Sequence, residues 1–301
     1  MEETGAKKKQ RIHPYLKLAI KIGLSALAMW VVFRKVELTE VWELVRQSNV
    51  SLLLLALVLF NVSKWLSAYR LQAILKAINI DLGMRFHMQL CYVGMFYNLF
   101  LPGSVGGDGY KVVYLNKRFP TGLRLLVASM LYDRASGGAV LLSMAFAFGI
   151  FVTPYFDWFP EYSNLMTLIF AGLCIPALFL GTRLVFPSFW SARYPVLLWS
   201  VGVQGVQVLC AYAILLAFGV SELFMLYFVL FLASSLASML PVSFGGVGLR
   251  ELVFVYAAQY LPIDETPAVS LGMMYFVVIA LSSFVGIFIK LPENTPAPAA
   301  S

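Results

Sequence analysis

Six charged residues stand in or beside apolar segments of this sequence and are the first candidates for chemistry. They are Asp108, Lys111, Asp133, Arg134, Arg250 and Glu251. Ionised side chains inside a membrane are costly and usually face the interior of a helix bundle. Lysine and arginine bind phosphate well, and arginine can do so through two parallel hydrogen bonds. We therefore expect the three cations to bind a lipid phosphate and the three carboxylates to balance them when the site is empty.

The spacing of these residues limits how they can meet. Asp108 and Lys111 are three residues apart, so they can share one face of a helix. Asp133 and Arg134 are adjacent, so their side chains diverge and each needs a partner on another element. Structural roles are the alternatives: Asp108 can cap a half-helix, and Glu251 can complement a helix dipole. Asp133 and Arg134 can likewise form purely structural ion pairs.

Two copies of one glycine-rich loop carry several of these charges. LPGSVGGDGYK at 101–111 and LPVSFGGVGLR at 240–250 align without gaps at an offset of 139 (240 − 101) and share six of eleven positions. The loop residues are Pro102, Gly103, Ser104, Gly106 and Gly107 in the first copy and Pro241, Ser243, Gly245, Gly246 and Gly248 in the second. We expect each proline to end a half-helix, the glycines to allow a tight reversal, and the following helix to offer free N–H groups to an anion. The alternative is that these glycines serve helix packing.

The elements that position these loops must be membrane helices. The 301 residues are 60% hydrophobic and 12% charged, which excludes an ordinary soluble fold. Hydropathy predicts spans at 16–33, 50–69, 124–152, 163–182, 195–218 and 267–289, the first of them a retained anchor. The shorter apolar stretches 86–101 and 223–240 each lead into a glycine loop, and they are either full spans or re-entrant hairpins.

The distribution of positive charge favours the re-entrant alternative. Short cytoplasmic loops are enriched in lysine and arginine. With both stretches re-entrant and both termini cytoplasmic, fifteen lysines and arginines fall inside and three outside. Segments 37–48 and 70–84 each have one apolar stripe, so they either lie flat in the interface or pack on neighbours as connecting helices. Lys64, near the predicted end of its span, is expected to snorkel to the interface and not to belong to the site.

The same offset relates the spans of the two halves, which predicts an inverted repeat. The fold class is an all-α integral membrane protein with six transmembrane helices and two re-entrant helical hairpins. The predicted parts are a basic N-terminus (1–14), a first repeat (15–153, hairpin 86–117), a second repeat (154–290, hairpin 223–261) and a disordered tail (291–301). Inverted repeats with broken helices near the midplane are a recurrent architecture of transporters.

Several other functions are not supported by the sequence. The basic residues are scattered between apolar segments, so nucleic-acid binding is not expected. Cys91, Cys174 and Cys210 lack paired spacing, and His13 and His87 lack a second ligand at helical spacing, so we expect neither a metal nor another cofactor. There is no phosphate-binding Walker loop, zinc-protease motif or serine-hydrolase elbow, and no soluble domain large enough for a transferase. We do not expect an enzyme.

The segments NLFLPGSVGGDGYKVVYL, LYDRASG and LPVSFGGVGLRELV resemble the transmembrane, flippase-like domain of lysylphosphatidylglycerol synthases over residues 15–290. The resemblance implies a unit that moves lipid between leaflets of the cytoplasmic membrane, without the synthase domain that charges the lipid. The expected partner is a membrane lipid with an anionic headgroup, a phospholipid or a polyprenyl or glycolipid phosphate. The alternatives are a membrane-embedded lipid-phosphate transferase and a non-transporting scaffold. Expected protein partners are a second copy of the chain or envelope-synthesis enzymes.

Overall fold

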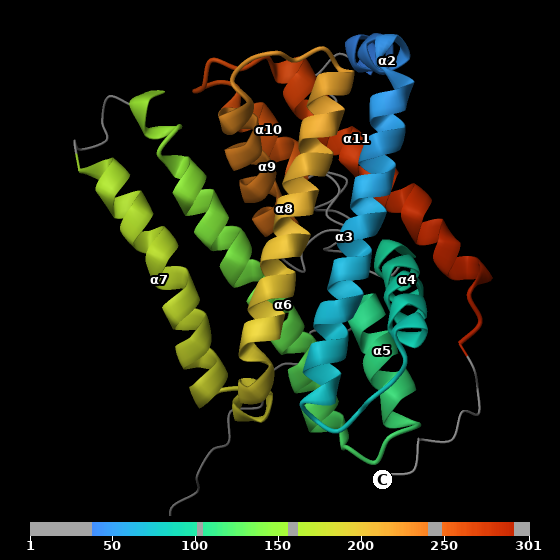
Figure 1. Cartoon of the computed structure of the whole chain (residues 1–301). Helices are drawn as coiled ribbons and strands as arrows, with labels where there is room; N and C mark the ends of the chain where they lie inside the picture. Colours follow the sequence, from blue (N-terminus) through green and yellow to red (C-terminus); the bar gives the residue numbers. More distant parts are fainter. Residues whose placement is uncertain (1–37, 101–104, 156–161, 240–248, 292–301) are drawn as a thin grey trace, which may run out of the picture.

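The protein is a bundle of helices in the computed structural model, which describes residues 38–100, 105–155, 162–239 and 249–291 (Figure 1). The described residues contain no strand. In hydrocarbon every backbone amide must find its partner inside the protein, and the α-helix meets this need within one segment. The all-α membrane fold expected from composition is therefore confirmed.

Five helices of the described chain are long and apolar enough to cross a membrane. They are α3 (Val50–Lys76), α6 (Leu123–Gly149), α7 (Ser163–Leu184), α8 (Arg193–Ala217) with its preceding 3₁₀ turn from Pro187, and α11 (Glu265–Phe284), which continues in 3₁₀ form to Phe288. The shortest, α7, has 22 residues, against the roughly 20 that a crossing needs. They correspond to five of the six predicted spans. The sixth, at 16–33, lies outside the described residues.

Two pairs of shorter helices lie at opposite ends of the bundle. The first pair is α4 (Met84–Phe100) and α5 (Gly106–Asn116), and the second is α9 (Phe224–Met239) and α10 (Leu249–Ala257). At 1.5 Å per residue the longest of these four is about 26 Å, short of the roughly 30 Å hydrocarbon layer. Figure 1 shows α4 and α5 in the lower half of the view and α9 and α10 in the upper half. This placement suits two opposed hairpins, while the inverted repeat and the side that each end faces stay predictions.

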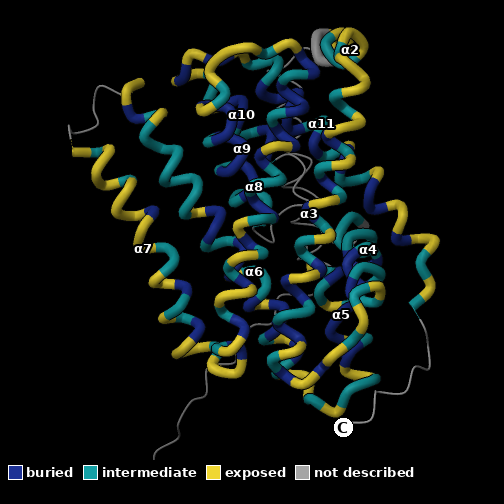
Figure 2. Tube along the Cα trace, viewed as in Figure 1, coloured by how far each residue is buried: buried dark blue, intermediate teal, exposed yellow. Residues whose placement is uncertain are grey.

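The outer surface of the bundle is apolar. Large hydrophobic side chains such as Leu165, Phe170 and Leu180 of α7 are exposed, and α7 packs mainly against α6 at the edge of the bundle. Figure 2 shows α7 exposed or half-buried along much of its length. Lipid tails can cover such an apolar surface without a cost in free energy. These exposed side chains are therefore suited to contact with the hydrocarbon of a membrane.

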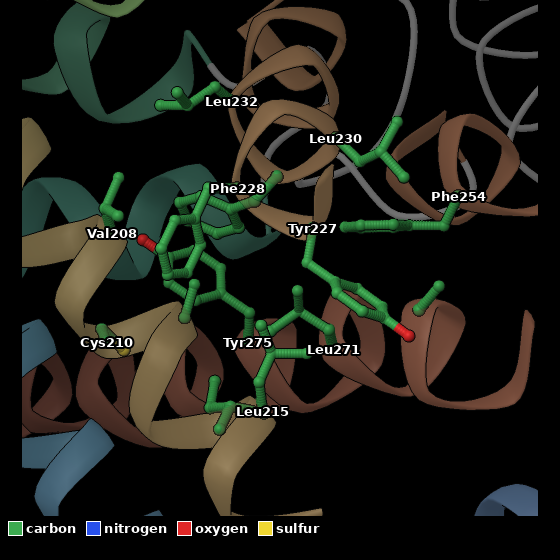
Figure 3. Packing of buried hydrophobic residues seen from close by; sticks show 14 of the residues in the cluster. Val208, Cys210, Leu215, Tyr227, Phe228, Leu230, Leu232, Phe254, Leu271 and Tyr275 are labelled. Atoms are coloured by element: carbon green, nitrogen blue, oxygen red, sulfur yellow. The ribbon is translucent and has the colours of Figure 1, made fainter. Parts of the chain in front are cut away.

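Two buried clusters form the core, one near each pair of short helices. The upper cluster joins side chains of α8, α9, α10 and α11, including Phe231, Phe254 and Tyr275 (Figure 3). The lower cluster joins the last turns of α3 with α4, α5 and α6, including Leu75 and Leu115. Helix α3 contributes to both, and its middle residues lie between them.

Of the two predicted connecting segments, one is placed differently in the structure. Helix α3 runs seven residues past its predicted end, so 70–76 is not an interfacial helix; Leu71, Ile74 and Leu75 are buried by neighbouring helices. The alternative, packing on neighbours, is correct there. Helix α2 (Leu38–Gln47) forms as expected, with Trp42 exposed and Val45 against the upper cluster.

Candidate functional site

A buried ion pair joins α3 to α6. Arg70 donates from Nε to Asp133 Oδ1 at 2.8 Å and from Nη2 to Oδ2 at 3.2 Å, and its Nη1 donates to Ser200 Oγ of α8 at 3.2 Å. The side chains of Arg70 and Asp133 are 9% and 18% exposed. A Cβ on Gly137 would come within 2.8 Å of Arg70 Nη1, so this glycine leaves the room that the guanidinium fills. The bidentate geometry is the strong form of this interaction and ties three helices together.

A second ion-pair group joins α5 to α6. Asp108 accepts from Arg134 Nε at 2.5 Å and lies 3.4 Å from Lys111 Nζ. Asp108 therefore balances two cations at once. The divergence predicted for Asp133 and Arg134 is confirmed, since one reaches α3 and the other α5. The shared face predicted for Asp108 and Lys111 is confirmed as well.

Close backbone contact brings α5 against α4. A Cβ on Gly107 would overlap the backbone of Gly94, approaching its carbonyl carbon to 2.6 Å, so only glycine fits there. Asn98 of α4 accepts a hydrogen bond from Gly107 N–H at 2.8 Å. Gly106 and Gly107 lie in the first turn of α5 and not in a reversal. Gly107 makes the close approach to a neighbouring backbone that is also expected of these glycines, and it is a packing glycine, the alternative that the sequence left open.

Arg250 of α10 is buried and forms no salt bridge with a described residue. Its side chain is enclosed so that the residue is 7% exposed, and its Nη2 donates to Ser238 Oγ of α9 at 3.3 Å. Its guanidinium carbon lies 4.7 Å from the centre of the Tyr275 ring and 5.7 Å from that of Phe231. Within the described chain, Nη1 of Arg250 has no hydrogen-bond partner. An unpaired buried donor of this kind is costly unless something binds it.

Two adjoining cavities, each of about 300 Å³, collect these charges. We call the first the ion-pair cavity; its charged lining residues are Lys64, Arg70, Asp108, Lys111, Asp133 and Arg134. The second is the cationic cavity; its charged lining residues are Lys64, Arg134 and Arg250. Both cavities are also lined by Met95, Asn98 and Met239, so they share one boundary.

The cavities differ in how their charge is balanced. The ion-pair cavity has four cations and two carboxylates, whereas the described lining of the cationic cavity has three cations and no carboxylate. Together they hold five cations and two carboxylates, a formal excess of three positive charges (5 − 2). The segments 101–104 and 240–248, which connect the helices of each pair, contain no charged residue. An anion is the ligand that this lining favours.

Sequence reasoning missed two residues of the site. Lys64 does not snorkel; it lies mid-helix on α3, its Nζ is 4.4 Å from the centre of the Phe60 ring, and it lines both cavities. Arg70 begins segment 70–84, which the sequence predicts to be a cytoplasmic connecting or interfacial helix. A signal was available, because no glycine or proline interrupts 50–76 and both cations therefore had to lie on one continuous helix.

The remaining predicted site residues are placed as follows. Glu251 is buried at 2% exposure and lines neither cavity. Asp108 makes ion pairs, and the N-cap position of α5, Val105, provides no side-chain cap. Outside the described residues lie Pro102, Gly103, Ser104, Pro241, Ser243, Gly245, Gly246 and Gly248. In the described part of the chain, no group of three histidine, cysteine or carboxylate side chains is placed to hold a metal ion.

Comparison with known proteins identifies relatives. The family described as "Lysylphosphatidylglycerol synthase TM region" matches residues 18–195 and 190–286. The chain is also 22% identical to the UPF0104 membrane protein PH1989 of Pyrococcus horikoshii, over 86% of this chain and 91% of that protein. The family match covers the helices that build the two cavities.

Proposed function

This chain belongs to the lysylphosphatidylglycerol synthase TM region family, and from that premise we propose that it transports a lipid with an anionic phosphate headgroup between the leaflets of the cytoplasmic membrane. It is a multi-pass membrane protein, with five described helices of membrane-crossing length. The proposed cargo is held by its phosphate and is not changed covalently.

One observation carries the proposal: two adjoining cavities with an excess of positive charge lie among membrane-length helices. Cations buried in hydrocarbon are costly, and they persist where a ligand or a partner compensates them. The two carboxylates leave three cations of the lining uncompensated. A phosphate provides the missing negative charge and oxygen acceptors for several donors.

Arg134 is the residue best placed to couple binding with a change of contacts. It lines both cavities, and it is paired with Asp108 on the side of the ion-pair cavity. A phosphate in the cationic cavity offers Arg134 a second anionic partner. The two states then differ in how strongly α6 is tied to α5, which is the kind of differential contact that a transport cycle needs.

The carboxylates are less suited to catalysis than to this role. Asp133 is held by Arg70 through two hydrogen bonds, and Asp108 is held by Arg134 and Lys111. Both carboxylates are occupied by these cations and are not free to act as a general base on a substrate. This supports transport over group transfer.

Reconstitution of the purified full chain into liposomes tests the proposal. The lipids are acyl-chain-labelled phosphatidic acid and phosphatidylglycerol, and a membrane-impermeant quencher reports how much label reaches the outer leaflet. We expect protein-dependent movement that falls at least roughly tenfold in Arg134→Gln and Arg250→Gln, the loss of a charge-assisted hydrogen bond or more. Arg124→Gln is the matched control, because Arg124 is on the same helix as Arg134 but is exposed.

Two results would contradict the proposal. If neither lipid moves with the wild-type chain, or if both variants move lipid normally, a non-transporting scaffold becomes the better interpretation. If a new lipid product appears in extracts of the liposomes, the chain is a transferase.

A further inference from the structure

The cationic cavity is lined by two cations, Lys64 and Arg250, that form no salt bridge with a described carboxylate. Lys64 Nζ lies over the Phe60 ring at 4.4 Å, and the Arg250 guanidinium lies over the Tyr275 ring at 4.7 Å. The two rings meet edge to face, with centres 5.7 Å apart. An aromatic pair therefore stands between the two cations and holds each of them beside the same cavity.

Aromatic rings position a cation without neutralising it. A cation–π contact is weak compared with the cost of leaving a buried charge uncompensated. Lys64 donates no hydrogen bond to a described residue, and Arg250 keeps Nη1 unpaired although the residue is 93% buried (100 − 7). These cations face a cavity of about 300 Å³ whose described lining has no carboxylate, and Glu251, buried next to Arg250, acts on it from outside that lining.

The third cation is already half-compensated. Arg134 lines the cavity but shares Asp108 with Lys111, so it adds donors more than uncompensated charge. Three cations line the cavity, and Asp108 and Glu251 offset only part of their charge from outside its lining. The cavity therefore keeps more than one positive charge for a ligand to balance.

We propose that the cationic cavity selects a dianionic phosphate, the charge state of a phosphomonoester, over a singly charged phosphodiester. A phosphomonoester carries about −1.5 to −2 charges at pH 7. It also presents three terminal oxygens, enough for Lys64, Arg250 and Arg134 to bind different atoms. The proposal rests on the proposed function for the source of the phosphate, a lipid headgroup, and it narrows the class of that lipid.

A pair of lipids that differ by one methyl group tests the selection. Dioleoyl phosphatidic acid and dioleoyl phosphatidylmethanol have the same tails and the same phosphate, but the methyl ester blocks one charge. The purified full chain in detergent micelles is titrated with an equimolar mixture at pH 7, and native mass spectrometry counts each bound lipid. We expect phosphatidic acid to be preferred by roughly tenfold or more, because it gains one charge-assisted interaction.

Variants assign the preference to the cavity. Lys64→Met and Arg250→Gln should each reduce the preference to about twofold or less, since one cation then matches one phosphodiester charge. Lys64→Arg, which keeps the charge, should retain it. Lys76→Met and Arg183→Gln are the controls: each removes one positive charge from an exposed position and should leave the preference unchanged.

The outcomes separate this inference from the proposed function. Equal binding of the two lipids by the wild-type chain overturns the selection, even if liposomes show transport of both. A preference without any transport supports the selection and removes the proposed function. Glycerol 3-phosphate is the third arm: displacement of phosphatidic acid at equal concentration supports the phosphomonoester class but assigns it to a free phosphate. The comparison of the two lipids on the wild-type chain does not depend on whether any variant folds.

Discussion

The two pairs of short helices are built alike but are charged differently. In the first pair, Lys111 of α5 has Asp108 beside it at 3.4 Å. At the offset of 139, Arg250 corresponds to Lys111, but Val247 corresponds to Asp108. The second pair therefore lacks a carboxylate three residues before its cation; its own carboxylate, Glu251, directly follows Arg250, is buried and lines neither cavity. Val247 itself lies outside the described residues.

The same contrast extends to the long helices. Lys64, Asp133 and Arg134 correspond at this offset to Val203, Gly272 and Met273, so the second half lacks their charges. The first half thus holds the ion pairs of the described site, and the second half contributes Arg250, which forms no salt bridge with a described carboxylate. The difference teaches that similar backbones can have two tasks: cations in salt bridges tie helices together, and a cation outside any salt bridge is left for a ligand.

The largest expected effect comes from breaking the compensated side. Asp133→Leu leaves Arg70 buried without its carboxylate, and we expect the free energy of unfolding to fall by about 3–5 kcal/mol. The double variant Arg70→Leu/Asp133→Leu should lose much less, since no buried charge is then unpaired. Unfolding titrations in detergent measure both.

The exposed pair of Lys76 and Asp81 is the control for this prediction. Its side chains are 50% and 69% exposed, so Asp81→Ala should cost about 0–1 kcal/mol. The prediction is wrong if the double variant loses as much free energy of unfolding as Arg70→Leu and Asp133→Leu lose together. The two side chains would then not compensate each other.

The second effect concerns the contact that holds the first pair together. Gly107→Ala places a Cβ against the backbone of Gly94, and we expect a loss of about 1–3 kcal/mol from overpacking. Gly109→Ala lies two residues on in α5 with nothing within 4 Å, so it should stabilise by up to about 1 kcal/mol through helix propensity. If both alanines had the same effect in thermal unfolding, the close approach of α4 and α5 would not be what stabilises the pair.

Much of the fold could be predicted because membrane crossing leaves a simple signal. Five spans follow from runs of apolar residues, and the need of Asp133 and Arg134 for separate partners follows from their adjacency. The identity of those partners did not follow. Which residue of α3 meets Asp133 depends on how each helix is rotated and where it ends, and these are set by many weak contacts that no single segment specifies.

Lys64 and Gly107 show the two kinds of error. Hydropathy averages over a window, so the charges at 64 and 70 shortened the predicted span and moved Lys64 to its end. Gly107 stands in a glycine-rich sequence typical of a turn, yet in the structure its missing Cβ admits another helix. Glycine is compatible with both roles, and only the neighbouring helix decides between them.

The third prediction concerns a substitution that gives the second helix pair a carboxylate beside its cation, as in the first pair. Ser238 Oγ accepts from Arg250 and lines the cationic cavity, so Ser238→Asp places a carboxylate beside the unbalanced guanidinium. We expect binding of phosphatidic acid to weaken roughly tenfold, about 1.4 kcal/mol, as one cation becomes compensated. Ser238→Asn, of the same shape but neutral, should change binding less than threefold in the same titration. Equal weakening by both would mean that side-chain size, not charge, controls the cavity.

The smallest expected effect comes from the converse change in the first pair. Asn98 corresponds to Ala237 in the second half, so Asn98→Ala removes the acceptor that Gly107 N–H uses at the start of α5. Loss of such a bond costs about 0.5–2 kcal/mol, typically near 1. Gln207→Ala is the control, because Gln207 also lines the ion-pair cavity but makes no hydrogen bond to the described residues of α5. Thermal unfolding of the two variants should separate them by about 1 kcal/mol. A smaller gap would mean that the glycine contact alone fixes α5 against α4, and the two helix pairs would then differ in charge but not in how their backbones are held.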